Sequence, residues 1–139
     1  MQLKELFTSR QAKDSATLAA RTTGWFLVIV ITVLSLVPAS LRPETGVPHK
    51  LEHFAIFVLT GFAFGIGYNR KLFLVILSLV LFTGATELAQ FLVPSRHPRL
   101  MDFVVDGIAV CIGAVAGKMI AHKLGNEPSS SFGRMNPRK

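Results

Sequence analysis

Residues 72–93 read LFLVILSLVLFTGATELAQFLV, and Glu87 is the only ionisable residue among them. A run this long with so little charge exceeds a typical strand and matches the roughly 20 residues that cross a hydrocarbon core as a helix. Lipid offers no hydrogen-bonding partners, so the backbone of such a segment must satisfy its own polar groups, as a helix does. The stretch therefore predicts a transmembrane helix.

Three further apolar runs have a similar length, and they lie at residues 23–40, 51–68 and 103–121. The connections are short: a basic turn at 68–71 and two proline-containing loops at 41–50 and 94–101. Short connections favour sequential helices that are antiparallel neighbours. The predicted fold class is therefore all-α, an integral membrane bundle of four transmembrane helices.

The composition of the whole chain agrees with this class. Of 139 residues, 50% are hydrophobic and only 17% are charged, whereas soluble domains carry about 25% charged residues. One cysteine, Cys111, excludes an internal disulfide framework and is expected to act as a small apolar residue. The net charge of +7 is attributed to basic loops and tails at a membrane surface, so no nucleic-acid partner is expected.

The flanks divide the chain into three parts. Residues 1–22 are predicted to be a cytoplasmic N-terminal tail, solvated rather than an interfacial helix, and 23–124 the membrane domain. Residues 125–139 lack hydrophobic periodicity and are predicted to be a disordered basic C-terminal tail. An alternative for the first apolar run is a signal peptide cleaved after Ala39.

The distribution of basic residues predicts the orientation. Eleven Lys and Arg residues lie in the N-terminal tail, the 68–71 turn and the C-terminal end, against four in the two proline-containing loops. Cytoplasmic segments carry the excess of Lys and Arg, so both termini are expected in the cytoplasm. The expected location is the bacterial cytoplasmic (inner) membrane, crossed several times.

Polar residues gather at the predicted outer ends of the helices. The candidate ligand-binding residues are Lys50, His53, Glu87, Gln90, Arg96, Arg99, Asp102 and Asp106. Thr83, Glu87 and Gln90 share one helical stripe, and Asp102 and Asp106 begin another. Because acidic groups are costly in lipid, we expect them to face the bundle interior and to pair with neighbouring His, Lys or Arg residues.

Two small-residue motifs predict close helix packing. Gly61 and Gly65 form one GxxxG motif, and Gly113 and Gly117 form another. Such motifs let helix backbones approach each other. We expect them to act mainly within the bundle, with a homodimer as the alternative.

His49, Glu52 and His53 form an H-x-x-E-H pattern, which occurs in one class of zinc peptidases. Two histidines one helical turn apart could share a metal ion, with a further ligand from Glu87, Asp102 or Asp106. The short pattern occurs readily by chance, and a hydrogen-bonding cluster at a helix start is the favoured interpretation. No cofactor is expected.

The same residues resemble the VanZ-like family of small membrane proteins. The matching segments are His49-Lys50-Leu51-Glu52-His53-Phe54, then Glu87-Leu88-Ala89-Gln90, a loop with Pro94 and Arg96, and finally Asp102, Asp106 and Gly113. The resemblance covers about residues 48–120. It implies a role in the cell envelope, because the family is named after a member that raises resistance to the glycopeptide teicoplanin.

Three functional hypotheses follow. In the first, the polar cluster binds a lipid-linked envelope precursor or a glycolipid, with Arg96 and Arg99 on its anionic group. In the second, the protein is an intramembrane enzyme in which His53, Glu87 or Asp102 transfers protons on a lipid-linked substrate. In the third, the cluster only locks the helices together. Whether the protein is an enzyme stays open, and membrane lipids are its expected partners.

Overall fold

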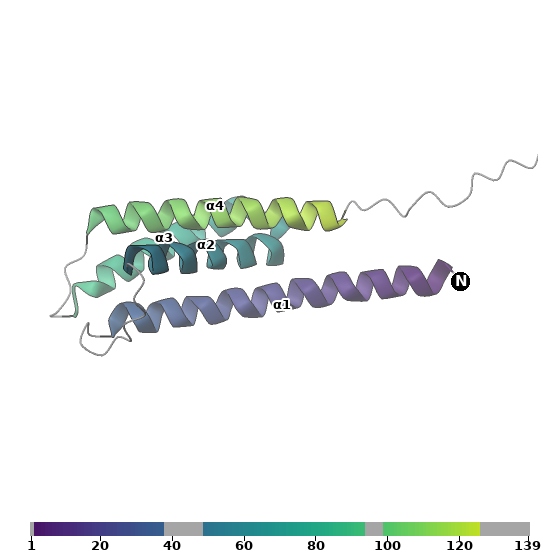
Figure 1. The fold of residues 1–139 in the computed structure, drawn as a ribbon, viewed down its shortest axis with the longest axis horizontal. Coiled ribbons are helices and arrows are strands. Elements are labelled where there is room, and N and C mark those ends of the chain that lie inside the picture. The colour runs from purple at the N-terminus through teal and green to yellow at the C-terminus, as the bar shows by residue number, and fades with distance from the viewer. Residues whose placement is uncertain (1, 38–48, 94–98, 126–139) are drawn as a thin grey trace, which may run out of the picture.

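The computed structural model describes residues 2–37, 49–93 and 99–125, and within these ranges every regular element is a helix (Figure 1). The elements are α1 (Gln2–Leu36), α2 (His49–Gly67), the short 3-10 helix η2 (Asn69–Lys71), α3 (Leu72–Gln90) and α4 (Leu100–Gly125). The all-helical fold class is confirmed. The predicted disordered tail and the cleavage site at Ala39 lie outside the described residues.

The helices run up and down along one long axis (Figure 1). α2 and α4 run in one direction, and α1 and α3 run in the other, so sequential helices are antiparallel as predicted. The ends of α1 and α3 therefore meet the beginnings of α2 and α4 at one end of the bundle. The opposite end carries the start of α1, the tight turn between α2 and α3, and the end of α4.

Three helical segments are long and apolar enough to cross a membrane, and they span Arg10–Leu36, Asn69–Gln90 and Leu100–Lys123. The fourth predicted span is also an apolar helix, but its qualifying segment, Leu51–Gly67, is shorter. By length and composition these helices indicate a multi-pass membrane protein. The predicted positions of the apolar runs thus agree with the helices to within a few residues, except at the start of α1.

The N-terminal segment differs from the prediction, because residues 2–22 are helical and continue without a break into the apolar part of α1. The segment contains neither proline nor glycine before Gly24 and is rich in alanine, which favours helix. Thr8 and Thr17 each donate a side-chain hydrogen bond of 2.9 Å to the carbonyl four residues earlier. The segment is largely exposed, but it is not an unstructured tail.

The most extensive helix contact joins α2 to α4, which are parallel and not sequential. Four glycines make this contact, and we call them the glycine seam: Gly61, Gly65, Gly113 and Gly117. A Cβ on either α2 glycine would meet the carbonyl oxygen of Val110 or Ala114, and a Cβ on either α4 glycine that of Val58 or Phe62. The motifs therefore act within the bundle, as expected.

The prediction that sequential helices are antiparallel neighbours holds for α1 with α2 and for α3 with α4, but much less for α2 with α3. α2 and α3 are joined by the short η2 turn, yet they share little contact. The backbone of α2 lies close against α4. α3 packs mainly on α4, and α1 packs on α2. Short connections make successive helices antiparallel, whereas the glycines pair α2 with α4 and not with α3.

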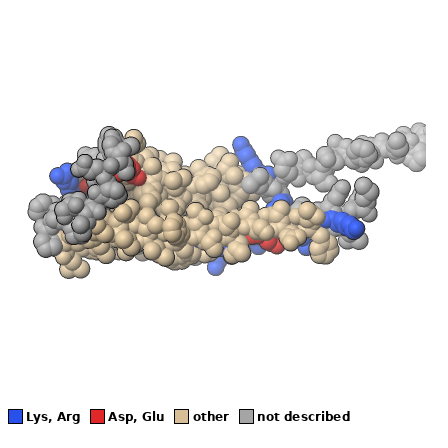
Figure 2. All heavy atoms as spheres, turned by 60° about the horizontal axis from the view of Figure 1, so that its bottom comes forward, with Lys and Arg blue, Asp and Glu red and all other residues tan. Residues whose placement is uncertain are grey.

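The bundle has an apolar interior that also contains several polar residues, and its exterior is apolar as well. Phe57, Val110 and Ala114 are buried, and so are Thr60 and Thr83. Large apolar side chains point outward, including Phe73 at 76% exposure and Leu92 at 83%. On the face shown in Figure 2, an uncharged band separates the charged side chains at one end from those spread over the other half. This distribution suits lipid surroundings.

Candidate functional site

Five polar residues form the candidate site, which we call the polar rim: His53, Glu87, Asp102 and Asp106 on three helices, and Arg99 directly before α4. His53 lies one turn into α2, Glu87 lies in the last turn of α3, and Asp102 and Asp106 lie in the first turns of α4. Because α2 and α4 are parallel, both helices direct their N-terminal ends toward this rim. The partial positive charge at those ends favours carboxylates nearby.

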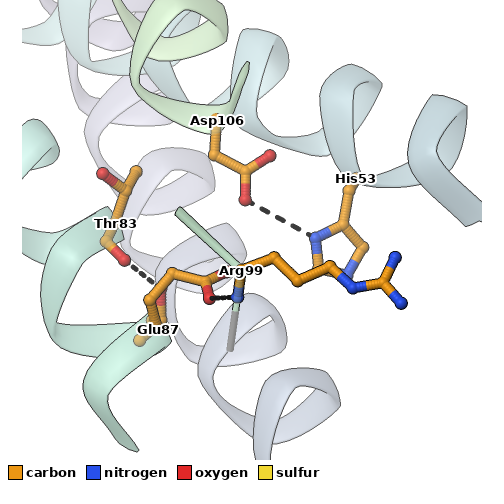
Figure 3. Close-up of polar contacts among 6 residues, drawn as sticks. His53, Thr83, Glu87, Arg99 and Asp106 are labelled. Atoms are coloured by element: carbon orange, nitrogen blue, oxygen red, sulfur yellow. Dashed lines mark hydrogen bonds and ion pairs between the residues drawn. The ribbon is translucent and has the colours of Figure 1, made fainter. Parts of the chain in front are cut away.

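His53 and Asp106 connect α2 to α4 above the glycine seam. The Nδ1 atom of His53 lies 3.7 Å from Oδ2 of Asp106, whose side chain is only 5% exposed (Figure 3). The imidazole is also in contact with the ring of Phe57, with centroids 6.0 Å apart. The sequence-based expectation that a rim carboxylate would pair with His53 is met by Asp106.

Glu87 connects α3 to the start of α4 through the backbone. The N–H of Arg99 donates a hydrogen bond of 3.3 Å to Oε2 of Glu87, and the N–H of Asp102 donates one of 2.9 Å to the carbonyl of Arg99. Figure 3 shows the Arg99 side chain extending away from the Glu87 carboxylate, and this side chain is exposed. Glu87 thus positions the arginine without neutralising its guanidinium.

The remaining carboxylates lie near enough to interact with one another electrostatically. Asp102, Asp106 and His53 all lie close enough to Glu87 to interact electrostatically with its carboxylate. Asp102 is half-buried in the first turn of α4, where the helix N-terminus favours a negative charge. Three carboxylates and one imidazole are therefore grouped at one end of the bundle.

The stripe predicted on α3 is confirmed for its two outer members, since Thr83 and Gln90 are buried while Glu87 is half-buried. Sequence analysis missed Thr86, which is also buried and donates a hydrogen bond of 2.8 Å to the carbonyl of Thr83. The signal was present, because Thr86 lies three residues after Thr83 and four before Gln90. This spacing places it on the same helical face.

Several predicted site residues are not placed by the structure. Arg96 lies outside the described residues, and so do the side chains of His49 and Lys50. Within the described residues, no group of three or more His, Cys, Asp or Glu side chains has the arrangement needed to hold a metal ion. The zinc hypothesis therefore gains no support from the part of the pattern that can be seen, namely Glu52 and His53.

Comparison with known proteins returned no relative: no protein-family model, no curated protein and no solved structure matches the chain. The VanZ-like resemblance therefore stays a prediction carried by the short motifs alone. What the polar rim can do has to be inferred from its chemistry. That chemistry combines an exposed guanidinium, a histidine–carboxylate pair and a carboxylate that fixes the backbone between α3 and α4.

Proposed function

We propose that the protein is a VanZ-like membrane protein of the bacterial cell envelope, whose polar rim binds the anionic head group of a lipid-linked or glycolipid envelope component. The observation that carries the proposal is the hydrogen bond between Glu87 and the backbone of Arg99. It positions the arginine at the end of the bundle and leaves its guanidinium exposed. A guanidinium binds phosphate through paired hydrogen bonds.

The surroundings of Arg99 support an amphipathic ligand. Next to it on α4, Leu100 and Met101 are exposed at 79% and 70%, and in the turn after α3 Leu92 is exposed at 83%. A cationic group flanked by outward apolar side chains matches a ligand with an anionic head and a hydrocarbon chain. The excess of basic residues at the opposite end supports an extracytoplasmic position for the polar rim.

His53 and Asp106 have a supporting role in this proposal. They join α2 to α4 at the rim and so hold the start of α4, and with it Arg99, in a constant position. A ligand phosphate bound by Arg99 would then meet a prepared surface, which reduces the ordering needed on binding. Lys50 and Arg96, adjacent in sequence to the rim, are proposed as further contacts.

The experiment compares binding of a polyprenyl phosphate with that of the matching uncharged polyprenol, using purified protein in nanodiscs and native mass spectrometry. Arg99→Gln should weaken phosphate binding by about tenfold, the loss of one charge-assisted hydrogen bond, and leave polyprenol binding unchanged. Lys123→Gln, an exposed change at the other end of α4, is the matched control. Equal binding by wild-type protein and Arg99→Gln would refute the proposal.

A second candidate function is an intramembrane enzyme that acts on a lipid-linked substrate, and the His53–Asp106 pair favours it. A buried carboxylate beside an imidazole orients the ring, as in many sites of general acid–base catalysis. Glu87 and Asp102 are further proton-transfer candidates. Release of phosphate from a polyprenyl pyrophosphate by wild-type protein, but not by His53→Gln, would favour this function. Binding without any release would exclude it for that substrate.

The third hypothesis, a purely structural cluster, makes a different prediction from both. The rim contacts link α2 to α4 and α3 to α4, so they contribute to assembly in any case. If assembly were their only role, substitutions at His53, Glu87 and Asp102 would each reduce folding. Variants that fold normally but lose ligand binding would contradict that hypothesis.

A further inference from the structure

An apolar groove opens between α1 and α3, over α2 and beside the tight turn that joins α2 to α3. Its volume is about 410 Å³, within the usual range for ligand pockets of roughly 300–1,000 Å³. The residues that matter for its chemistry are Trp25, Phe64, Tyr68, Lys71, Ser78 and Phe82. The groove exists because α1 packs on α2 and has little contact with α3.

One wall of the groove is a connected set of aromatic rings. The rings of Trp25 and Phe64 meet edge to face with centroids 5.4 Å apart, and those of Phe64 and Tyr68 stack at 5.7 Å. The indole N–H of Trp25 donates a hydrogen bond of 3.3 Å to the Tyr68 hydroxyl. These contacts fix the wall in place, so the groove is formed before any ligand enters.

The end of the groove at the α2–α3 turn is basic. Lys71 lines the groove and is exposed, and Arg70 precedes it. Arg21 donates a hydrogen bond of 2.8 Å from Nε to the carbonyl of Gly67, and its guanidinium lies 4.7 Å from the centre of the Tyr68 ring. Figure 2 shows Lys and Arg side chains gathered toward this half of the molecule.

The chemistry of the groove therefore changes along its length, from apolar to cationic. In a bilayer, an open apolar groove between helices faces lipid chains, and Trp and Tyr gather at the level of the head groups. Basic pockets between transmembrane helices recognise anionic head groups. We propose that this groove binds an anionic phospholipid, with an acyl chain along Phe64 and Phe82 and the phosphate at Lys71. The proposal concerns the end opposite the polar rim and does not depend on the proposed function.

Trp25 provides a direct test because it is the only tryptophan in the chain. The purified protein is reconstituted in phosphatidylcholine vesicles that contain increasing fractions of brominated phosphatidylglycerol or, separately, brominated phosphatidylcholine. Bromine quenches tryptophan fluorescence at short range, so the two titrations compare the lipids at the groove. We expect brominated phosphatidylglycerol to be preferred by about fivefold at equal fraction, the effect of one basic residue near an anionic lipid.

Two variants connect the preference to the groove. Lys71→Gln should abolish most of the preference, whereas Lys118→Gln, an exposed lysine of α4 outside the groove, should leave it unchanged. Ser78→Phe places a ring in the groove at an exposed position and should reduce quenching by both lipids. Circular dichroism verifies that each variant retains its helices.

The proposal is overturned by equal quenching with the two lipids in wild-type protein. It is also overturned if Lys118→Gln lowers the preference as much as Lys71→Gln, since the preference would then reflect net charge alone. Quenching by both lipids that Ser78→Phe leaves undiminished would place the lipid at the surface and not in the groove.

Discussion

The glycine seam and the polar rim both join α2 to α4, and they do so in opposite ways. In the seam, backbone meets backbone, and no space remains for even a methyl group. In the rim, the side chains of His53 and Asp106 meet at 3.7 Å, which is long for an ion pair, and Glu87 of α3 accepts a long hydrogen bond of 3.3 Å from the backbone N–H of Arg99. The difference indicates that the seam is the main determinant of how α2 and α4 assemble, and that the longer contacts of the rim contribute less.

The largest effect should come from adding methyl groups to the seam. In Gly113→Ala the new Cβ would meet the carbonyl oxygen of Val58 and lie 2.8 Å from the backbone nitrogen of Phe62. Neither backbone atom can move independently, so the helices must separate, at a cost of about 2 kcal/mol or more. Gly61→Ala, on the facing helix, should behave alike. The free energy of unfolding in mixed detergent micelles measures the effect.

Gly107→Ala is the matched control for this prediction. A Cβ at Gly107 has no neighbour within 4 Å, although the residue lies in the same helix. The substitution should stabilise the protein slightly, by roughly 0.5–1 kcal/mol, because alanine favours helix more than glycine. Equal destabilisation by Gly113→Ala and Gly107→Ala would mean that the seam is not the determinant of assembly.

The next effect concerns the pairing of His53 with Asp106. Asp106→Asn and His53→Gln, measured singly and together, should give a coupling energy of about 0.6 kcal/mol, the average for polar pairs between membrane helices. The imidazole and the carboxylate are 3.7 Å apart, so a larger coupling is not expected. A coupling as large as the loss in Gly113→Ala would remove the contrast between rim and seam.

A smaller effect is expected for Glu87→Gln. The glutamine carbonyl oxygen can still accept the hydrogen bond from the Arg99 backbone, and the negative charge beside Asp102 and Asp106 is lost. The free energy of unfolding should change by no more than about 0.5 kcal/mol. Glu87→Leu, which cannot accept that bond, should destabilise the protein more. If both variants unfolded to the same extent, the backbone hydrogen bond would not be the relevant contact.

The smallest effect is expected for Thr60→Val, although Thr60 is fully buried. Its hydroxyl donates a hydrogen bond of 2.7 Å to the Ile56 carbonyl in its own helix, so it does not bridge α2 to a neighbour. Valine has a similar shape, and the helix retains its backbone bonds, so stability should change by less than about 0.5 kcal/mol. A thermal unfolding comparison in detergent is sufficient. A loss above 1 kcal/mol would indicate a contact between helices that the hydroxyl supports.

Much of this fold follows from patterns that depend only on neighbouring residues. The apolar run at residues 72–93 predicts α3 because length and hydrophobicity are local properties, and the same holds for α4. The pairing of α2 with α4 does not follow from connection length. It depends on whether Gly61 and Gly113 meet in register, and that register is a property of two distant segments.

The polar rim was predicted in part for a similar reason. Helical spacing placed Thr83 and Gln90 on one stripe, which is buried, and it placed Asp106 on a stripe with Asp102. Spacing could not say that Asp106 meets His53, or that Glu87 contacts the backbone of Arg99 and not its guanidinium. Likewise, Arg21 looked like part of a solvated tail, because its contact with Tyr68 appears only when α1 lies on α2.

The parallel pairing of α2 and α4 has a consequence for biosynthesis. α3 lies between them in the chain, so the glycine seam can close only after α4 has left the ribosome and entered the membrane. At translation rates of about 5–20 residues per second, the interval lasts several seconds. During that time the glycine face of α2 must be covered by lipid or by the insertion machinery. The protein therefore completes its central contact last, and a chain interrupted before Gly117 would lack it.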